Sequence, residues 1–371
     1  MKKVISIALV LVIVLALFAG CGAKQEAASG KTIYITGPTP DHGWTAQAGA
    51  YAQKKVDEIN AAGKYKAVYM PASSGEEQCD QVQQIIANGD AAGVVFFALE
   101  DSAKAGQEAL ISEKIPFISF DRIIEGPDKY AILNASGDNW QCGAGIAYWL
   151  QQKGMVPGDT MVTLIGDNGT VCSRRQEGFE QFLRGEIKYH DEHTKQDYET
   201  TQVWTQAEID ALCADYKVVC NWSADGAYSY LEQKMVEIVE AAKNNNGKLF
   251  IYSMDDEMTF GVLRLLEGNA LPEATKADLE AMEVYISAIG GMQELYDVMA
   301  GKEGTQAPIA QKYFDDMMSV YFSPKMMTNV IGYMEDYLDG NWSYKVGDGK
   351  YEVVWIVDAG NVSQYEGFTG H

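Results

Sequence analysis

Several charged and aromatic residues stand beside apolar runs of the sequence, at positions where they could bind a small ligand. Asp121 and Arg122 follow one apolar run, and Asp255 follows another. Trp44 and Trp222 stand just before amphipathic stretches. Carboxylates and guanidinium groups make paired hydrogen bonds to neighbouring hydroxyls, and an indole face packs on apolar C–H groups. These residue types together are typical of a site for a polyhydroxylated ring.

Apolar runs and amphipathic stretches alternate along the chain. Continuous apolar runs are typical of strands buried on both faces, and their alternation with helices indicates parallel sheets. We expect strands at 32–36, 67–70, 93–98, 116–120, 131–133, 161–165, 249–253 and 284–289. We expect helices at 45–60, 76–87, 102–113, 142–152, 174–183, 228–243, 257–267 and 293–299. The fold class is therefore α/β, and because so many strands would strain one open sheet, we expect two doubly wound parallel-sheet lobes.

Ligands of doubly wound sheets bind outside the carboxyl ends of the strands, which is where these residues fall. The segments at predicted strand ends or helix starts are DHGW (41–44), DR (121–122), GDNG (166–169), RR (174–175), NWSAD (221–225) and DD (255–256). Each residue alone also fits a structural role, because Asp41 or Asp255 could cap a helix. Trp44 and Trp222 could lie in the core, and Arg174 could be solvated. Their shared placement favours a common site.

Composition and motifs narrow the function. The chain has 371 residues, and 47% of them are hydrophobic, which excludes global disorder. The formal net charge of -23 would repel phosphate backbones, so we expect no nucleic-acid partner. The sequence contains no nucleophile elbow, phosphate-binding loop or dinucleotide fingerprint, so we expect neither an enzyme nor a cofactor. His190 and His193 have a metal-like spacing but no suitable third ligand nearby, so we expect no metal site.

The N-terminal segment has the pattern of an export signal. Lys2 and Lys3 precede an apolar run that ends in small residues, and this run is short for a membrane-spanning helix. The segment FAGC (18–21) resembles the bacterial lipobox, in which the cysteine is acylated after cleavage. We therefore expect a signal peptide at 1–20, lipidation of Cys21 and a lipid-anchored linker at 21–30, which attach the protein to the cell membrane outside the cytoplasm.

Further cysteines follow in the exported part of the chain. They are Cys79, Cys142, Cys172, Cys213 and Cys220, an odd number, so at least one thiol stays unpaired. Cys213 and Cys220 are close in sequence. They could form a bridge or remain two buried thiols, and the sequence leaves both alternatives open.

Four ordered segments carry a resemblance to a known family. They are ISFDR (118–122), ASGDN (135–139), RRQEGF (174–179) and MDDEMTFG (254–261). With them the chain resembles, over roughly residues 31–340, the periplasmic sugar-binding proteins of the ribose and galactose type that serve ABC importers. The ligand-binding residues that this resemblance implies are Asp41, His42, Trp44, Asp121, Arg122, Arg175, Trp222 and Asp255.

The resemblance also implies the architecture. It predicts the type I periplasmic binding protein fold, in which two lobes are joined by a three-strand hinge, with crossovers near 134–139, 321–323 and 354–358. The N-terminal lobe would comprise 31–134 plus 322–354, and the C-terminal lobe 135–321 plus 355–371. A helix at 325–338 would pack in the first lobe although it comes late in the chain. Arg122 would be an exposed arginine of the cleft.

The function implied is capture of a monosaccharide by a monomer that delivers it to the membrane subunits of an ABC importer. The alternatives are a sensory receptor for a chemoreceptor or histidine kinase, and a receptor for a nucleoside or a furanosyl signal. Where many family members have an aspartate, this chain has Ile289, Gly290 and Gly291, and where a glutamine often lies it has Phe322. An insertion around 187–210 could be a surface feature or a contact for a partner.

Overall fold

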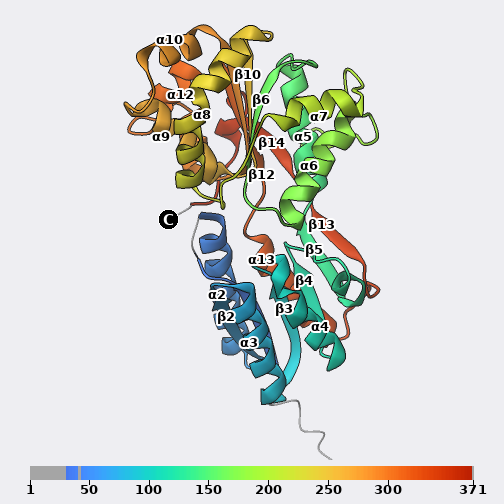
Figure 1. Ribbon diagram of the computed structural model, residues 1–371. Coiled ribbons are helices and arrows are strands. Elements are labelled where there is room, and N and C mark those ends of the chain that lie inside the picture. The colour runs from blue at the N-terminus through green and yellow to red at the C-terminus, as the bar shows by residue number, and fades with distance from the viewer. Residues whose placement is uncertain (1–30, 41–42, 370–371) are drawn as a thin grey trace, which may run out of the picture.

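The computed structural model describes residues 31–40 and 43–369. In it, two lobes each contain a six-stranded sheet flanked by helices (Figure 1). Among the described residues, every helix is too short or too polar to span a lipid bilayer. The predicted signal peptide 1–20, the lipidated Cys21 and the linker 21–30 lie outside the described residues, as do Asp41 and His42.

The first lobe is built on a parallel sheet with the strand order β13-β5-β4-β3-β1-β2. Its strands are β1 (Thr32–Pro38), β2 (Lys66–Ala72), β3 (Ala91–Phe97), β4 (Phe117–Phe120), β5 (Leu133–Gly137) and β13 (Gly349–Glu352). Its helices are α2 (Gly43–Ala62), α3 (Gly75–Asn88), α4 (Lys104–Ser112) and α13 (Met326–Leu338). The central strands are buried along their whole length, because helices cover both faces of the sheet.

The second lobe repeats this plan with the strand order β14-β12-β11-β10-β6-β9. Only β14 among these strands is antiparallel to its neighbour. The strands are β6 (Thr160–Ile165), β9 (Tyr216–Val219), β10 (Lys248–Ser253), β11 (Glu283–Gly290), β12 (Asp316–Tyr321) and β14 (Trp355–Asp358). The helices are α5 (Asn139–Gln152), α6 (Thr170–Leu183), α7 (Gln206–Ala214), α8 (Ala224–Asn244), α9 (Asp256–Glu267), α10 (Glu273–Ala281), α11 (Gln293–Met299) and α12 (Ala307–Tyr313). The predicted α/β class with two parallel-sheet lobes is thus confirmed.

Differences from the expected elements occur at the edges of the sheets and at β12, a buried interior strand of the second sheet that the predicted strands do not include. The run 131–133 predicts a strand, whereas the structure has β5 at Leu133–Gly137, because residues 134–137 pair with β13. The first sheet therefore continues past residue 134, the predicted end of that lobe segment. The sequence pattern does not predict β9 or β13, because both are partly exposed edge strands without a continuous apolar run.

The chain passes between the lobes at 138, at 322–325 and at 353–354. The late helix α13 lies on the first sheet, as expected (Figure 1). Its Glu335 pairs with Lys55 of α2 at 2.7 Å. Its Met334 fills the space above Gly93 of β3, where a Cβ would lie 2.5 Å from the Met334 sulfur. This helix is therefore part of the first lobe.

The insertion around 187–210 folds onto the second lobe. It contains the hairpin of β7 (Tyr189–Asp191) and β8 (Gln196–Tyr198). The Tyr198 ring stacks on Tyr148 of α5 with 4.5 Å between the ring centroids. The Tyr189 hydroxyl accepts a hydrogen bond from the Ile356 amide of β14 at 3.2 Å. The insertion therefore braces the strand that follows the third crossover.

The cysteines of the described residues are all free thiols. Of the two alternatives for Cys213 and Cys220, the structure shows the unbridged thiols. Burial raises the pKa of Cys213 to about 11 and that of Cys220 to about 12. The thiolate form is therefore scarce at neutral pH, and these cysteines act as apolar packing residues.

Candidate functional site

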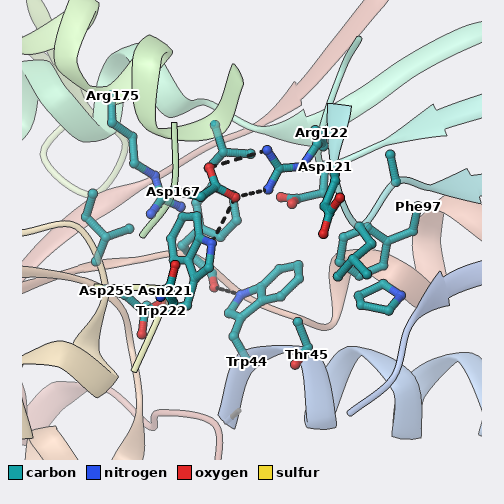
Figure 2. A pocket seen from close by; sticks show the side chains of 18 residues that line it. Trp44, Thr45, Phe97, Asp121, Arg122, Asp167, Arg175, Asn221, Trp222 and Asp255 are labelled. Atoms are coloured by element: carbon teal, nitrogen blue, oxygen red, sulfur yellow. Dashed lines mark hydrogen bonds and ion pairs between the residues drawn. The ribbon is translucent and has the colours of Figure 1, made fainter. Parts of the chain in front are cut away.

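A cavity of about 310 Å³ lies between the two lobes, at the carboxyl ends of their strands, and Figure 2 shows its lining side chains. The first lobe and the hinge contribute Pro38, Trp44, Thr45, Phe97, Ala98, Leu99, Glu100, Asp121, Arg122 and Phe322. The second lobe contributes Asp167, Val171, Arg175, Asn221, Trp222, Asp255, Ile289 and Gly290. The cavity thus brings together the six predicted site residues that the structure describes: Trp44, Asp121, Arg122, Arg175, Trp222 and Asp255.

Asp121 and Arg122 follow β4 directly and enter the cavity from the first lobe (Figure 2). Asp121 has a positive φ of 60°, a conformation that aspartate tolerates better than most residues, and its amide donates to the Ala135 carbonyl at 2.8 Å. Arg122 is only 5% exposed, not the exposed cleft residue that the sequence predicts. The reason is that it reaches across to the second lobe and is covered by it.

Asp167 is the partner of Arg122 on the second lobe, and it is absent from the predicted set. Arg122 Nη2 donates to Asp167 Oδ2 at 2.6 Å, and Nη1 lies 3.4 Å from Oδ1. Burial raises the pKa of the Asp167 carboxyl, but the charge and hydrogen bonds of Arg122 outweigh burial and hold this pKa below its ordinary value. The sequence does contain a signal for Asp167. The GDNG segment that includes it directly follows a buried strand, as Asp121 does.

One nitrogen of the Arg122 guanidinium takes no part in this ion pair. The Nε of Arg122 is buried and has no hydrogen-bond partner. Asp101 lies near the same guanidinium, with 3.6 Å between Nη1 and its Oδ1. An acceptor on a bound ligand could therefore complete the hydrogen bonding of Arg122.

Trp222 projects from a turn that precedes α8. Both Asn221 and Trp222 have positive φ angles, 52° and 56°, in a region that residues with side chains seldom adopt. The indole lies against Gly166, where a Cβ would come within 2.1 Å of ring atoms. Its Nε1 donates to Asp167 Oδ2 at 3.1 Å, so one carboxylate joins Trp222 to Arg122 of the other lobe (Figure 2).

Arg175 of α6 is buried behind this indole. Its Nε donates to Asn139 Oδ1 at 2.9 Å, and its Nη1 donates to the Met254 carbonyl. Its guanidinium carbon lies 5.6 Å from the centroid of the Trp222 ring and 5.0 Å from that of Phe322. Arg175 thus supports two aromatic walls of the cavity while lining it.

Asp255 combines the two roles that the sequence leaves open. Its Oδ1 accepts a hydrogen bond from the Glu257 amide at 2.9 Å, which caps the N-terminus of α9, and its side chain also lines the cavity. The neighbouring Asp256 points elsewhere: its Oδ2 accepts from the amides of Gly291 at 2.6 Å and Met292 at 2.7 Å. Burial raises the pKa of Asp256 to about 7.

Trp44 is both a core residue and a lining residue. It is 7% exposed, and its ring centroid lies 5.9 Å from that of Phe97 and 5.7 Å from that of Phe322. Its Nε1 donates to the Phe322 carbonyl at 2.7 Å. Phe322 packs in turn on Gly137 of the first crossover, where a Cβ would lie 2.1 Å from the Phe322 ring. Trp44 therefore ties α2 to the hinge.

The lining carries an excess of negative charge. Four carboxylates face two guanidinium groups, and Arg122 is already paired with Asp167. Such a cavity repels anionic ligands, whereas hydroxyl groups can donate to its carboxylate oxygens.

The two histidines with metal-like spacing lie away from the cavity lining. His190 Nδ1 lies 2.7 Å from Asp197 Oδ1, whereas the ring centroid of His193 lies 4.6 Å from those of Trp355 and Tyr365. The described part of the chain contains no group of His, Cys, Asp and Glu that could hold a metal ion.

Solved structures share this fold at low sequence identity. The binding component of the arabinose ABC transporter from Shewanella sp. ANA-3, bound to L-arabinofuranose, has a TM-score of 0.63 and 16% identity, covering 90% of this chain and 94% of its own. The Caulobacter myo-inositol binding protein has a TM-score of 0.64 and 15% identity, covering 91% and 96%. A Mycobacterium smegmatis protein in complex with β-D-fucofuranose has a TM-score of 0.62 and 13% identity, covering 90% and 93%.

Sequence comparison points the same way as the fold. No curated protein sequence matches the chain. The family model described as "Periplasmic binding protein domain" matches residues 33–315, most of both lobes. The chain therefore belongs to the periplasmic binding protein family.

Proposed function

We propose that this protein captures a neutral monosaccharide between its lobes and delivers it to the membrane subunits of an ABC importer. The observation that carries the proposal is the convergence of Asp121 and Arg122 from one lobe with Asp167 and Trp222 from the other on one cavity. Carboxylate and guanidinium groups there can bind ring hydroxyls, and the aromatic walls can cover the apolar faces of a sugar.

The charge of the cavity supports a neutral ligand. Its net negative lining disfavours sugar phosphates and sugar acids. Its volume of about 310 Å³ is at the small end for ligand sites, which suits one sugar ring. Solved proteins of the same fold carry arabinofuranose, myo-inositol and fucofuranose, all of them neutral polyols.

The mechanism follows from contacts that cross the cleft. Arg122 of the first lobe bonds Asp167 of the second, and Arg174 Nη2 of α6 donates to the Ile123 carbonyl at 3.4 Å. A sugar that contacts both walls adds to these contacts and stabilises the closed arrangement by hinge bending. The closed arrangement is the form that importer subunits would bind.

The proposal assigns binding and no catalysis. A glycosidase needs one protonated carboxyl as an acid, and two of the four lining carboxylates are poorly suited to this role, because the pKa of Asp167 lies below its ordinary value and Asp255 caps a helix. The protein acts as a monomer without a cofactor or a nucleic-acid partner. It is held outside the cytoplasm by a lipid on Cys21, through the linker 21–30, after removal of the signal peptide 1–20.

The proposal is tested by calorimetric titration of the purified protein with neutral aldoses, inositol, uronic acids and nucleosides. We expect saturable one-to-one binding of at least one neutral sugar and none of the uronic acids. Binding of nucleosides alone, or of uronic acids in preference to neutral sugars, would contradict it. The variant Cys21→Ser checks the anchor separately, because it lacks the thiol that would be acylated. Cells grown with a labelled fatty acid should label the wild-type protein and leave Cys21→Ser unlabelled, and equal labelling of both would contradict the lipid anchor.

A further inference from the structure

One part of the cavity wall is a main-chain turn that the predicted binding residues do not include. The turn 290–292 begins at the last residue of β11, and its Gly290 lines the cavity. The Gly290 carbonyl accepts a hydrogen bond from the Phe322 amide at 2.9 Å, and Phe322 lies at the second crossover between the lobes. The same turn therefore contacts both the ligand site and the hinge.

The turn has little rigidity of its own. Gly291 has a φ of 90°, a conformation that favours glycine. A Cβ on Gly290 would lie 2.7 Å from Asp256 Oδ2, and a Cβ on Gly291 would lie 2.8 Å from the Tyr321 ring. Neighbouring groups thus exclude side chains at both positions. Because glycine has more backbone freedom than any other residue, contacts from outside the turn are needed to hold it in one conformation.

Asp256 supplies the first of these contacts. It is the first residue of α9 and is only 1% exposed. Its Oδ2 accepts from the amides of Gly291 at 2.6 Å and Met292 at 2.7 Å, and its Oδ1 accepts from the Ser319 hydroxyl of β12 at 2.7 Å. One carboxylate thus fastens the turn to α9 and β12, although Asp256 itself does not line the cavity.

A segment near the end of the described chain supplies the second contact. The Phe368 amide donates to the Gly291 carbonyl at 3.0 Å, and the Phe368 carbonyl accepts from the Gln293 amide at 2.7 Å. The Gly367 amide donates to Gln293 Oε1 at 2.8 Å. The Phe368 side chain is buried in the core. The segment 367–368 therefore joins the turn in a short parallel bridge.

From these contacts we propose that Asp256 and the segment 367–368 are positioning elements of the ligand site, which hold the turn 290–292 in the conformation in which Gly290 lines the cavity and bonds the hinge. The inference rests on the proposed function, because the site that these elements support is the sugar site. A turn that is fixed before the ligand arrives loses little conformational entropy on binding. A turn released from either contact would have to be ordered by the ligand, and affinity would fall.

The variant Asp256→Ala tests the carboxylate contact. It leaves the amides of Gly291 and Met292 without this acceptor, and we expect sugar binding to weaken about tenfold. Asp256→Asn keeps an oxygen acceptor for both amides and should recover most of the lost affinity. Calorimetry on the full chain measures both variants. The probe is whichever of L-arabinose, D-ribose, D-galactose and myo-inositol binds the wild type most tightly.

The matched control is Asp159→Ala. Asp159 is also a buried carboxylate, whose Oδ2 accepts from the Val156 amide at 2.7 Å and whose Oδ1 accepts from the Asn246 side chain at 2.8 Å. It directly precedes β6, at the opposite end of that strand from the cavity. We expect Asp159→Ala to lower the melting temperature and to leave the affinity of the folded protein unchanged. A purely structural role of Asp256 would give this same result in Asp256→Ala.

The variant Phe368→Ala tests the second contact, with Phe314→Ala as its control. Both phenylalanines are 8% exposed and belong to the core, but Phe314 lies just before β12, at the end of that strand away from the cavity. Removal of either ring should reduce stability. Only Phe368→Ala should also weaken sugar binding, by about three- to tenfold.

The outcomes separate the inference from the function on which it rests. Melting curves establish which variants are folded, and Phe368→Ala tests the inference by itself if Asp256→Ala does not fold. Wild-type affinity in a folded Asp256→Ala or Phe368→Ala variant would overturn the inference, and the sugar-binding function would stand. If no neutral sugar binds the wild type, the sugar-binding function is wrong and the inference falls with it.

Discussion

Trp44 and Trp222 reach one cavity from opposite lobes, but the protein holds them by different means. Trp44 is packed among Phe97, Phe120 and Phe322, and its Nε1 is bonded to a hinge carbonyl. Trp222 stands on a turn with positive φ angles, and its Nε1 is bonded to Asp167. The first indole is therefore part of the core that supports the cleft. The second is bonded to the Asp167 carboxylate, which also accepts from Arg122 of the other lobe.

This difference predicts that equivalent substitutions in the two walls have different consequences. Changes in the first-lobe wall around Trp44 should reduce the free energy of unfolding. Changes at Arg122, Asp167 and Trp222 should reduce affinity for the ligand.

The largest expected effect is the loss of stability in Trp44→Ala. Removing a buried indole leaves a cavity in the first lobe, and we expect the free energy of unfolding to fall by about 3 to 5 kcal/mol. Urea titration measures this change. Trp44→Phe keeps a ring but loses the bond to the Phe322 carbonyl, so it should lose only about 1 kcal/mol. Equal stability of wild type and Trp44→Ala would show that the indole is not part of the core.

The next effect is the loss of affinity in Arg122→Ala. The substitution removes hydrogen bonds to the ligand and leaves Asp167 without its positively charged partner, so binding should weaken by about 2 to 4 kcal/mol. The matched control is Arg264→Ala, because Arg264 is a surface arginine that pairs with Asp225 outside the cavity. Calorimetry should show wild-type affinity for the control, and equal affinity of both variants would place the ligand elsewhere.

A smaller effect is expected for Trp222→Ala. Loss of its ring should weaken sugar binding by about 1 to 3 kcal/mol, judged from the apolar area that an aromatic side chain covers. Trp222→Phe should lose much less, since a flat apolar ring remains. If Trp222→Ala lowers the melting temperature as much as Trp44→Ala and leaves affinity unchanged, the contrast between the two indoles is wrong.

Asp255 allows its two roles to be separated. Asp255→Ala removes the helix cap and should reduce stability by about 1 kcal/mol, whereas Asp255→Asn can still cap α9 and should be nearly as stable as wild type. Both variants should bind the sugar more weakly if the carboxylate accepts from a ligand hydroxyl. Normal affinity in Asp255→Asn would restrict the residue to its structural role.

The smallest expected effect is the pH dependence of the Arg122–Asp167 ion pair. The pKa of Asp167 is lower in the folded protein than its ordinary value, so folding is favoured where the carboxylate is ionised. The contribution of the ion pair to the free energy of unfolding is present above about pH 4 and is lost as the pH falls through the lowered pKa of Asp167. Melting temperatures of wild type and Asp167→Asn should converge in acid and diverge above about pH 5. A constant difference across this range would contradict the ion pair.

The sequence predicts most of the buried strands but few of the edge strands, and the exception among the buried strands is β12, which lies outside the predicted runs. The continuous apolar runs of β1, β3 and β6 indicate their burial, because a strand covered by helices on both faces has apolar residues at nearly every position. The edge strands β9 and β13 take their pairing from neighbours that come from distant parts of the chain. Their partly exposed residues give no comparable signal.

The site shows the same limit. Asp121 and Arg122 can be selected as lining residues because they follow a buried strand. Asp167 follows a strand as well, but its partner is on the other lobe, and sequence alone does not specify that contact. Trp44 could not be assigned to core or cavity, because an indole that lines an apolar wall is packed like a core residue on its other sides.

The central claim is that a neutral sugar binds between the lobes and contacts both of them. A calorimetric double-mutant cycle with Arg122→Ala, Trp222→Ala and the combined variant, titrated with the preferred sugar, tests it most directly. The account predicts that each single variant weakens binding and that the losses are not additive, because the ligand and Asp167 couple the two walls. Wild-type affinity in either single variant would contradict the account.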